Sequence, residues 1–207
     1  MINITGGSPE SAGLGQSSTE LLTAQGWQDY IPLPHATRSH CLVKINTTHV
    51  LMADHHSYTF SNDQGFVRIA DMIRPRDQAA CALHGTNYVI VAGGTGPHPK
   101  GQWRQSVGYT TEVFSLQDMK WHQGPAFGPD GPYPDPPALY GGVMISEGEN
   151  TFMFGEKKIF WLFTGAGSAG IDGWKWVLLQ DHLKFRVYWD AFIVPSYNCS
   201  GGLQHID

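Results

Sequence analysis

Charged residues are scarce in this sequence, and basic residues form no cluster. Lys and Arg number 13 and Asp and Glu 18 in 207 residues, so 15% of the chain is charged and its formal net charge is -5. Proteins that bind nucleic acid normally carry a basic patch or stripe, which is missing here. Helix surfaces are also built largely from Lys, Glu and Arg. We therefore expect neither a nucleic-acid partner nor a mainly helical fold.

Long apolar runs are absent too. None reaches the roughly 18 residues that a membrane-spanning helix needs, so we expect no membrane span. The chain opens on a strand-like segment and not on a charged and then apolar signal sequence, which makes a cytoplasmic location the default. An extracellular location stays open, because Asn-x-Ser/Thr triplets begin at Asn3, Asn46 and Asn198.

The sequence also lacks the common catalytic and metal-binding motifs. It has no G-x-S-x-G elbow, no phosphate loop and no H-E-x-x-H, and its three cysteines include no C-x-x-C pair. We expect Cys41 and Cys81 to be small packing residues of two matching strands. The adjacent His55 and His56 would point to opposite sides of an extended chain. We predict no metal site and no cofactor, and we favour a binding protein over an enzyme.

Glycine and proline are abundant, with 25 and 13 residues, and 41% of the chain is hydrophobic. This balance is typical of many short strands joined by tight turns. The clearest strand is residues 87–94, an apolar run of β-branched and aromatic residues that ends in Gly93 and Gly94. Residues 76–83 before it, and residues 111–116 and 120–121 after it, complete a four-stranded meander.

The same order of strands recurs along the chain. Second strands end at Gly6, Ala53, Gly93 and Gly155, at intervals of 47, 40 and 62 residues. Periods of about 40 to 50 residues are typical of propeller blades. The long interval contains two insertions, residues 96–107 and 128–137, which are rich in glycine, proline and polar residues.

These repeats resemble the kelch repeat, which has an arginine-led first strand, a second strand ending in Gly-Gly, a glutamate opening the third and a Trp on the outer strand. The resemblance implies an all-β, kelch-type β-propeller of about four four-stranded blades over residues 1–195, followed by a tail at 196–207. The residues that match the structural pattern are Gly6, Gly7, Glu20, Trp27, Gly93, Gly94, Glu112 and Trp121.

The two ends of the chain are complementary in this pattern. It begins on a second strand, at residues 2–5, and ends on a first strand, at residues 186–194. We expect these two strands to pair and close the ring, because propellers leave no long sheet edge open. The alternatives are an open arc completed by a second copy, which would be a homo-oligomer, or an arc that belongs to a longer chain.

The kelch resemblance implies a non-enzymatic module that mediates protein-protein interaction. Arg38, Arg76 and Arg186 begin first strands, where kelch arginines grip a partner peptide, and an arginine suits that role because its rigid fork pairs with carboxylates. The alternative is that each arginine forms a salt bridge within or between blades. Trp103 and Arg104, in the first insertion, have the composition of an interface anchor, unless Trp103 folds back over a blade edge.

A small-molecule or glycan ligand is the second hypothesis. Some propellers of the kelch group act on carbohydrates, so a lectin, a sialate mutarotase-like protein or a galactose oxidase-like protein stays open by fold analogy alone. The galactose oxidase type needs a copper site with a cross-linked Cys-Tyr pair, a second tyrosine and two histidines. The sequence does not allow that set to be assigned.

Overall fold

The computed structural model describes residues 16–37, 39–54, 56–97, 103–104, 108–127, 141–155, 158–165 and 170–180. These residues form sixteen strands and no helix. The described residues therefore contain no helix that could span a membrane. The expectation of an all-β chain is confirmed for this part of the sequence.

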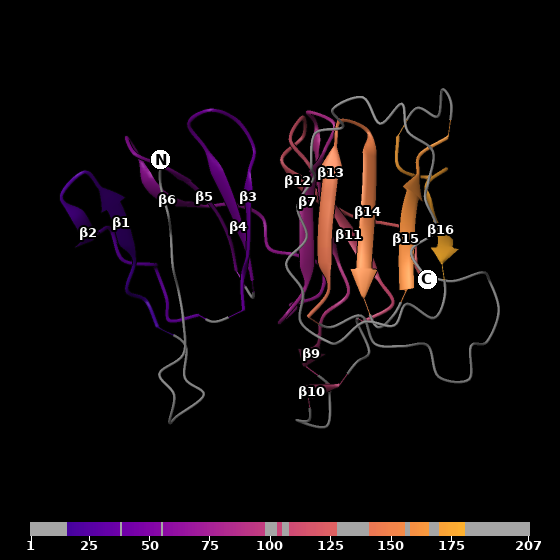
Figure 1. Cartoon of the computed structure of the whole chain (residues 1–207), viewed down its shortest axis with the longest axis horizontal. Coiled ribbons are helices and arrows are strands. Elements are labelled where there is room, and N and C mark those ends of the chain that lie inside the picture. The colour runs from indigo at the N-terminus through magenta and orange to yellow at the C-terminus, as the bar shows by residue number, and fades with distance from the viewer. Residues whose placement is uncertain are drawn as a thin grey trace, which may run out of the picture.

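Three antiparallel sheets of four strands each follow one another along the chain, and each is a simple meander (Figure 1). The first sheet contains β3 (Cys41–Lys44), β4 (Val50–Ala53), β5 (Ser57–Ser61) and β6 (Gly65–Arg68). The second contains β7 (Ala80–His84), β8 (Tyr88–Ala92), β11 (Thr111–Ser115) and β12 (Lys120–Gln123). The third contains β13 (Val143–Glu147), β14 (Asn150–Gly155), β15 (Lys158–Phe163) and β16 (Lys175–Gln180). We call them sheets I, II and III.

Two smaller sheets have two strands each. β1 (Glu20–Thr23) pairs with β2 (Gly26–Asp29) ahead of sheet I. β9 (Gly96–Pro97) pairs with β10 (Trp103–Arg104) inside the insertion between β8 and β11. The order of strands matches the sequence prediction in every described repeat. The insertion at residues 96–107 is a correction, because it was expected to be a plain loop and contains this short strand pair.

The first strands of the three sheets lie next to one another, with β7 between β3 and β13. A chain of backbone hydrogen bonds connects the segments that lead into them: Gln78 N–H donates to the Ser39 carbonyl at 3.3 Å, and Gly141 N–H donates to the Gln78 carbonyl at 3.1 Å. All three residues lie two positions before their strands and have φ between 54° and 63°. The repeats therefore share a local conformation as well as an order, and the architecture is propeller-like.

The described sheets form a row and not a closed ring. The β1–β2 sheet and β16 lie at opposite ends of the long axis in Figure 1. The segments expected to close the ring, residues 2–5 and 186–194, lie outside the described residues, as does the tail at 196–207. Ring closure therefore stays a prediction.

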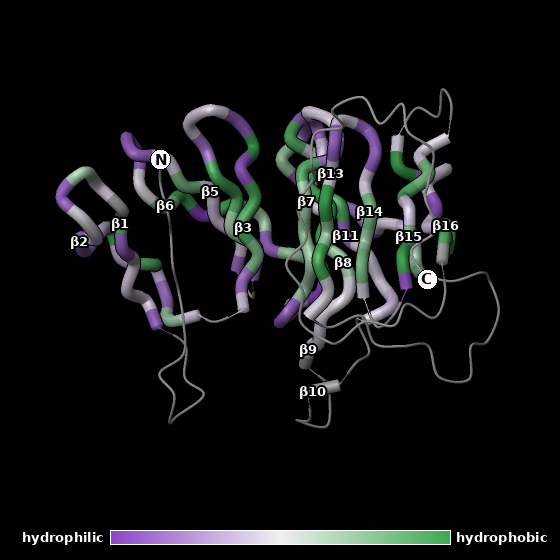
Figure 2. Tube along the Cα trace, in the orientation of Figure 1, coloured by the Kyte–Doolittle hydropathy of each residue, from purple (hydrophilic) through white to green (hydrophobic). Residues whose placement is uncertain are grey.

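Strand β8 is buried on both of its faces. Val89 and Val91 pack in a cluster shared with sheet I, while Ile90 and Ala92 pack in a cluster shared with sheet III. A strand covered on both faces needs apolar residues at every position, which explains why this run does not alternate. Figure 2 shows the result, with hydrophobic residues concentrated in the strands and hydrophilic ones at the turns.

Tryptophans on the outer strands of sheets II and III form hydrogen bonds toward the preceding sheet. Trp121 of β12 donates its indole N–H to the Ala70 carbonyl at 2.8 Å, just after sheet I. Trp176 of β16 donates in the same way to Thr111 Oγ1 of sheet II, also at 2.8 Å. Trp27 of β2 has no sheet before it among the described residues, and 53% of it is exposed. Trp121 thus connects sheet II to the segment that follows sheet I.

Cys41 and Cys81 form a disulfide between β3 and β7. This corrects the expectation that they only fill space. The two first strands lie side by side, which brings the Cα atoms to 6.1 Å, within the usual range for a disulfide. The bond closes a loop across 40 residues, and constraining a loop of that length in the unfolded chain stabilises the fold by about 4 kcal/mol.

Gly93 and Gly94 end β8 in a backbone conformation that side chains disfavour, with φ of 71° and 85°. A Cβ atom on Gly94 would lie 2.6 Å from the Asp77 carbonyl oxygen and 3.1 Å from the Ala79 nitrogen. Both contacts are with backbone, which cannot rotate away. A side chain at Gly94 would therefore be strained, both by its φ and by the neighbouring backbone. The other predicted pair, Gly6 and Gly7, lies outside the described residues.

We predict that Gly94→Ala lowers the free energy of unfolding by about 2 to 4 kcal/mol, because the cost of the positive φ and the cost of the close approach to Asp77 add together. Gly148→Ala is the matched control. Its φ is 58°, and a Cβ there would meet nothing within 4 Å, so only the conformational cost remains. Urea denaturation of both variants measures the difference. Equal losses would contradict the contact with Asp77.

Candidate functional site

Arg76, one of the three arginines expected to grip a partner, is fully buried inside sheet II. Its Nη2 lies 3.0 Å from Glu112 Oε1, and neither side chain is exposed. Its Nη1 donates to the Gly93 and Thr110 carbonyls, both at 2.9 Å. Burial lowers the pKa of Arg76, and the Glu112 carboxylate opposes that shift. The arginine thus forms a salt bridge within its blade, which was the alternative interpretation.

Glu112 completes this network from the third strand. Its Oε2 accepts from the Ile73 amide at 2.6 Å and its Oε1 from the Arg74 amide at 3.1 Å. The carboxylate therefore holds the incoming segment as well as the guanidinium. The arginine, the Gly-Gly end and the glutamate, which are far apart in the repeat pattern, meet at this one place.

Little of the structure of the other predicted partner-binding residues is described. Arg38 and Arg186 lie outside the described residues. For Trp103 and Arg104 only the backbone is described, where they pair with Pro97 and Gly96. The described structure therefore does not bring the predicted arginines together. Glu20, the remaining structural residue, is exposed on β1.

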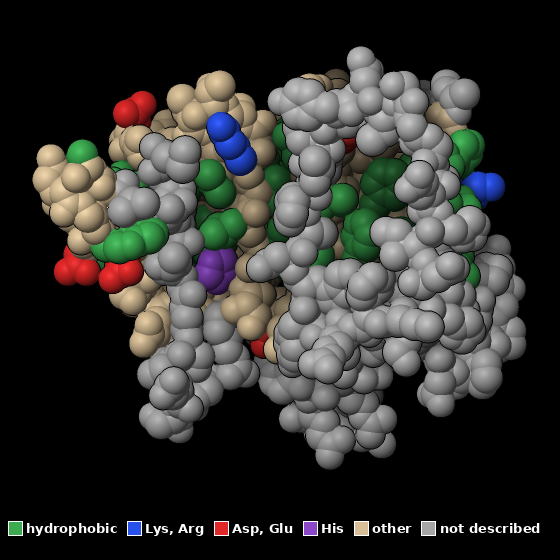
Figure 3. Space-filling view, in the orientation of Figure 1, with side chains coloured by type: hydrophobic (Ala, Val, Ile, Leu, Met, Phe, Trp, Pro, Cys, Tyr) green, Lys and Arg blue, Asp and Glu red, His purple; other side chains and the backbone are tan. Residues whose placement is uncertain are grey.

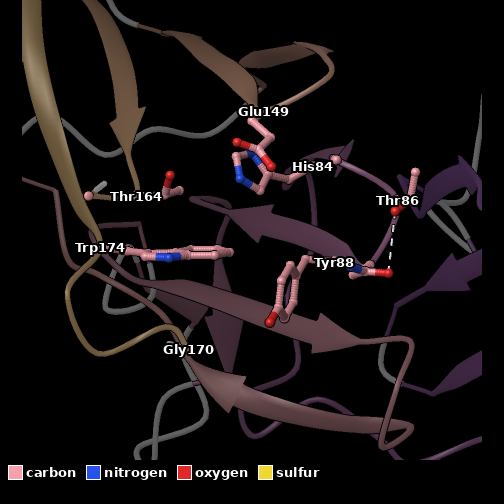
Figure 4. A pocket seen from close by; sticks show the side chains of 10 residues that line it. His84, Thr86, Tyr88, Glu149, Thr164, Gly170 and Trp174 are labelled. Atoms are coloured by element: carbon pink, nitrogen blue, oxygen red, sulfur yellow. Dashed lines mark hydrogen bonds between the residues drawn. The ribbon is translucent and has the colours of Figure 1, made fainter. Parts of the chain in front are cut away.

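A pocket between sheets II and III is the candidate site. Its volume is about 260 Å³, and Figure 4 shows the side chains that line it. His84 ends β7, Tyr88 begins β8, Glu149 lies in the turn between β13 and β14, and Trp174 precedes β16. A backbone hydrogen bond of 2.6 Å from Gly85 N–H to the Gly148 carbonyl ties two of these turns together.

The pocket combines three rings with one carboxylate. The Trp174 ring meets the Tyr88 ring edge to face, with centroids 5.1 Å apart and planes at 83°. The His84 ring lies 5.0 Å from Trp174. In Figure 4, Glu149 lies on the His84 side of the pocket. Edge-to-face packing of this kind fixes the rings firmly, so the aromatic wall is preformed.

His84 is held in place by Thr151. Its Nδ1 lies 2.9 Å from Thr151 Oγ1, which also pairs with the Ser146 hydroxyl. Burial lowers the pKa of His84, and the Glu149 carboxylate acts weakly in the other direction. The imidazole is therefore neutral near pH 7, which leaves Glu149 as the charge of the pocket.

This pocket was not predicted from the sequence. His84, Glu149 and Trp174 are not among the residues that match the repeat pattern. Glu149 lies 61 residues after Tyr88 and Trp174 lies 86 residues after it, so only the packing of two sheets brings them together. No motif of fixed spacing could have indicated the site.

A second polar cluster lies at the end of β4, on the opposite edge of the sheets. Asp54 is buried, accepts from the Thr37 hydroxyl and lies 3.4 Å from His35 Nε2. Burial lowers the pKa of the nearby His40, while Asp54 opposes the shift. Ala53 pairs with the first residue of β3 as Ala92 pairs with the first residue of β7, so Asp54 stands where the central repeat has Gly93. This network therefore replaces the Gly-Gly pattern in the degenerate repeat.

Metal-binding clusters are not found in the described part of the chain. His55 lies outside the described residues, and His56 contacts Asp71 and Arg68 instead, with its Nδ1 3.3 Å from Asp71 Oδ2. Among the described residues, charged side chains are also few and scattered on the face shown in Figure 3.

Comparison with known proteins bears on the fold. No protein-family model matches the chain, and no curated protein matches it. Solved structures do resemble it, among them that of YjhT, at 12% sequence identity and a TM-score of 0.56. The match covers 73% of this chain and 54% of that one, so the chain spans about half the length of YjhT. The likeness shows a shared fold.

We predict that Glu112→Ala lowers the free energy of unfolding by about 3 to 5 kcal/mol, because it leaves a buried cation unpaired. Glu112→Gln should cost less, since its amide oxygen still accepts from backbone. Asp118→Ala is the control: it removes a carboxylate from an exposed pair with His122 and should leave stability nearly unchanged. Thermal and urea unfolding measure all three. A Glu112→Ala variant as stable as Asp118→Ala would refute the buried network.

Proposed function

We propose that the chain is a non-enzymatic, kelch-type propeller module that binds a protein partner, and that the pocket over Trp174 receives a cationic side chain of that partner. The observation that carries this proposal is the meeting of two perpendicular aromatic rings, Tyr88 and Trp174, with the carboxylate of Glu149 in one pocket. A cation is attracted both to aromatic faces and to a carboxylate.

Charge favours a cation over an anion at this place. Glu149 is exposed at the pocket rim, and the depressed pKa of His84 keeps the imidazole neutral near pH 7. Neither Lys nor Arg lines the pocket among the described residues. An anionic ligand would meet Glu149 without any compensating charge.

Size favours a single side chain over a larger ligand. Pockets for drug-sized molecules usually measure about 300 to 1,000 Å³, and this one measures about 260 Å³. It also lies at the turns of two sheets, where a partner's surface could cover it. One Lys or Arg of a docked protein fits this space, with the rest of the interface outside it.

The kelch-type assignment is supported by the network around Arg76. Arginine, glycine and glutamate of the repeat pattern converge there through hydrogen bonds of 2.9 to 3.3 Å. We further propose that the row of described sheets is part of a propeller ring. The ring is completed either by pairing of residues 2–5 and 186–194, as the phase of the repeats predicts, or by a second copy or a longer chain.

A carbohydrate ligand is the second candidate. Asn87 and Thr164 also line the pocket and add polar groups beside the Trp174 ring, a combination that suits a sugar's hydroxyls and apolar face. A galactose oxidase-like site has less support, because Cys41 and Cys81 are bonded to each other, which leaves for a Cys-Tyr cross-link only Cys199, outside the described residues. A lectin or a sialate mutarotase-like protein stays open by fold alone.

We predict that short peptides with one Lys or Arg bind the protein, and that Glu149→Gln weakens them about tenfold, equivalent to about 1.4 kcal/mol. Fluorescence anisotropy with labelled peptides of equal length, carrying Lys, Arg, Gln or Glu at one position, measures this. High salt should weaken the Lys and Arg peptides most, because the attraction is partly electrostatic.

Glu147→Gln is the matched control, with the same change of charge at an exposed position two residues away. Equal weakening by both variants, or equal binding of the Gln and Lys peptides, would contradict the proposal. Binding of a neutral monosaccharide that Tyr88→Ala abolishes, without peptide binding, would favour the carbohydrate candidate.

A further inference from the structure

We propose that Asn46 carries an N-linked glycan. Two independent observations support a glycan at this residue. Asn46, Thr47 and Thr48 form an Asn-x-Thr triplet whose three residues are all exposed. The strand that precedes them, β3, is joined to β7 by the Cys41–Cys81 disulfide. Structural disulfides persist in oxidising compartments, and N-linked glycans are added in the secretory pathway, which is such a compartment.

The triplet forms the turn between β3 and β4. The Asn46 Oδ1 accepts hydrogen bonds from the backbone N–H of Thr48 and of His49, both at 2.8 Å, and from the Thr48 hydroxyl at 3.1 Å. Each of these contacts uses the oxygen of the side-chain amide. The nitrogen Nδ2, to which a sugar would be attached, makes no hydrogen bond described for this turn.

A glycan at this place would displace nothing from the core. The turn is closed by its own backbone, with Ile45 N–H donating to the His49 carbonyl at 3.0 Å. An open hollow of about 340 Å³ lies beside it, lined by Lys44 and by Asn62 and Asp63 of the neighbouring turn. These side chains are polar, as the neighbours of a first sugar residue need to be.

The chemistry requires a lipid-linked oligosaccharide pyrophosphate as donor. Asn46 Nδ2 forms a bond to C1 of the first sugar, and the bond between C1 and the pyrophosphate oxygen breaks. The lipid pyrophosphate leaves with the bonding electron pair, and Nδ2 gives one proton to a base of the transferase. The Thr48 hydroxyl is required at the second position after the asparagine.

The test uses the protein isolated from its natural source and the full chain secreted by eukaryotic cells behind an added leader. Peptide N-glycosidase treatment followed by peptide mass spectrometry should show conversion of Asn46 to Asp in both. In the secreted chain, Asn46→Gln and Thr48→Ala should abolish the modification, while Thr48→Ser should retain it. Asn62 is the internal control, because it lies exposed on the neighbouring turn but is followed by Asp63 and Gln64.

The state of the cysteines is measured in the same natural sample by alkylation before and after reduction. We expect Cys41 and Cys81 to be oxidised and Asn46 to be glycosylated together. An unmodified Asn46 in the natural protein would overturn the proposal, whether the cysteines are found oxidised or reduced. Retention of the glycan signal in Asn46→Gln at the same peptide would also overturn it.

Discussion

The buried ion pair of Arg76 and Glu112 is the constraint on which the central sheet depends. Removing two charges from water costs several kcal/mol each unless other groups satisfy them. Here the guanidinium and the carboxylate share hydrogen bonds with four backbone groups in three segments, at Ile73 and Arg74, at Gly93 and at Thr110. The pair therefore fixes how the incoming chain, the end of β8 and the start of β11 meet.

The same pair explains why glycine follows β8. The Gly93 carbonyl can reach Arg76 only because the backbone turns sharply at the strand end, with positive φ at two successive residues. Gly94 then passes close to the segment that contains Asp77. In the degenerate repeat, Asp54 occupies the place of Gly93 and forms a different network with Thr37 and His35. The repeat that lacks Gly-Gly thus has a different set of polar contacts at the end of its second strand.

Strand positions could be predicted from the sequence because each depends on local features. The run at residues 88–92 is apolar throughout since sheets cover both of its faces, and glycines at positive φ mark its ends. Three features could not be predicted because they depend on which strands become neighbours. These are the burial of Arg76, the bond between Cys41 and Cys81, and the pocket that joins Tyr88 to Trp174.

The structure separates the residues of the repeat pattern from those of the candidate site. The arginine and the glutamate of the pattern are buried inside sheet II and bonded to its glycine, where no partner reaches them. The pocket draws instead on turn residues such as Glu149, which the pattern does not specify. This division is common in repeat folds, where loops on a rigid scaffold carry the function.

Native-state hydrogen exchange of the Ile73 and Arg74 amides tests this account most directly. Both residues lie in an irregular segment, and 54% of Ile73 is exposed, so the surroundings alone would predict fast exchange. If Glu112 holds these amides within the buried network, both should exchange only with a free energy close to that of global unfolding. Exchange of either amide at the rate of an unprotected loop would contradict the account.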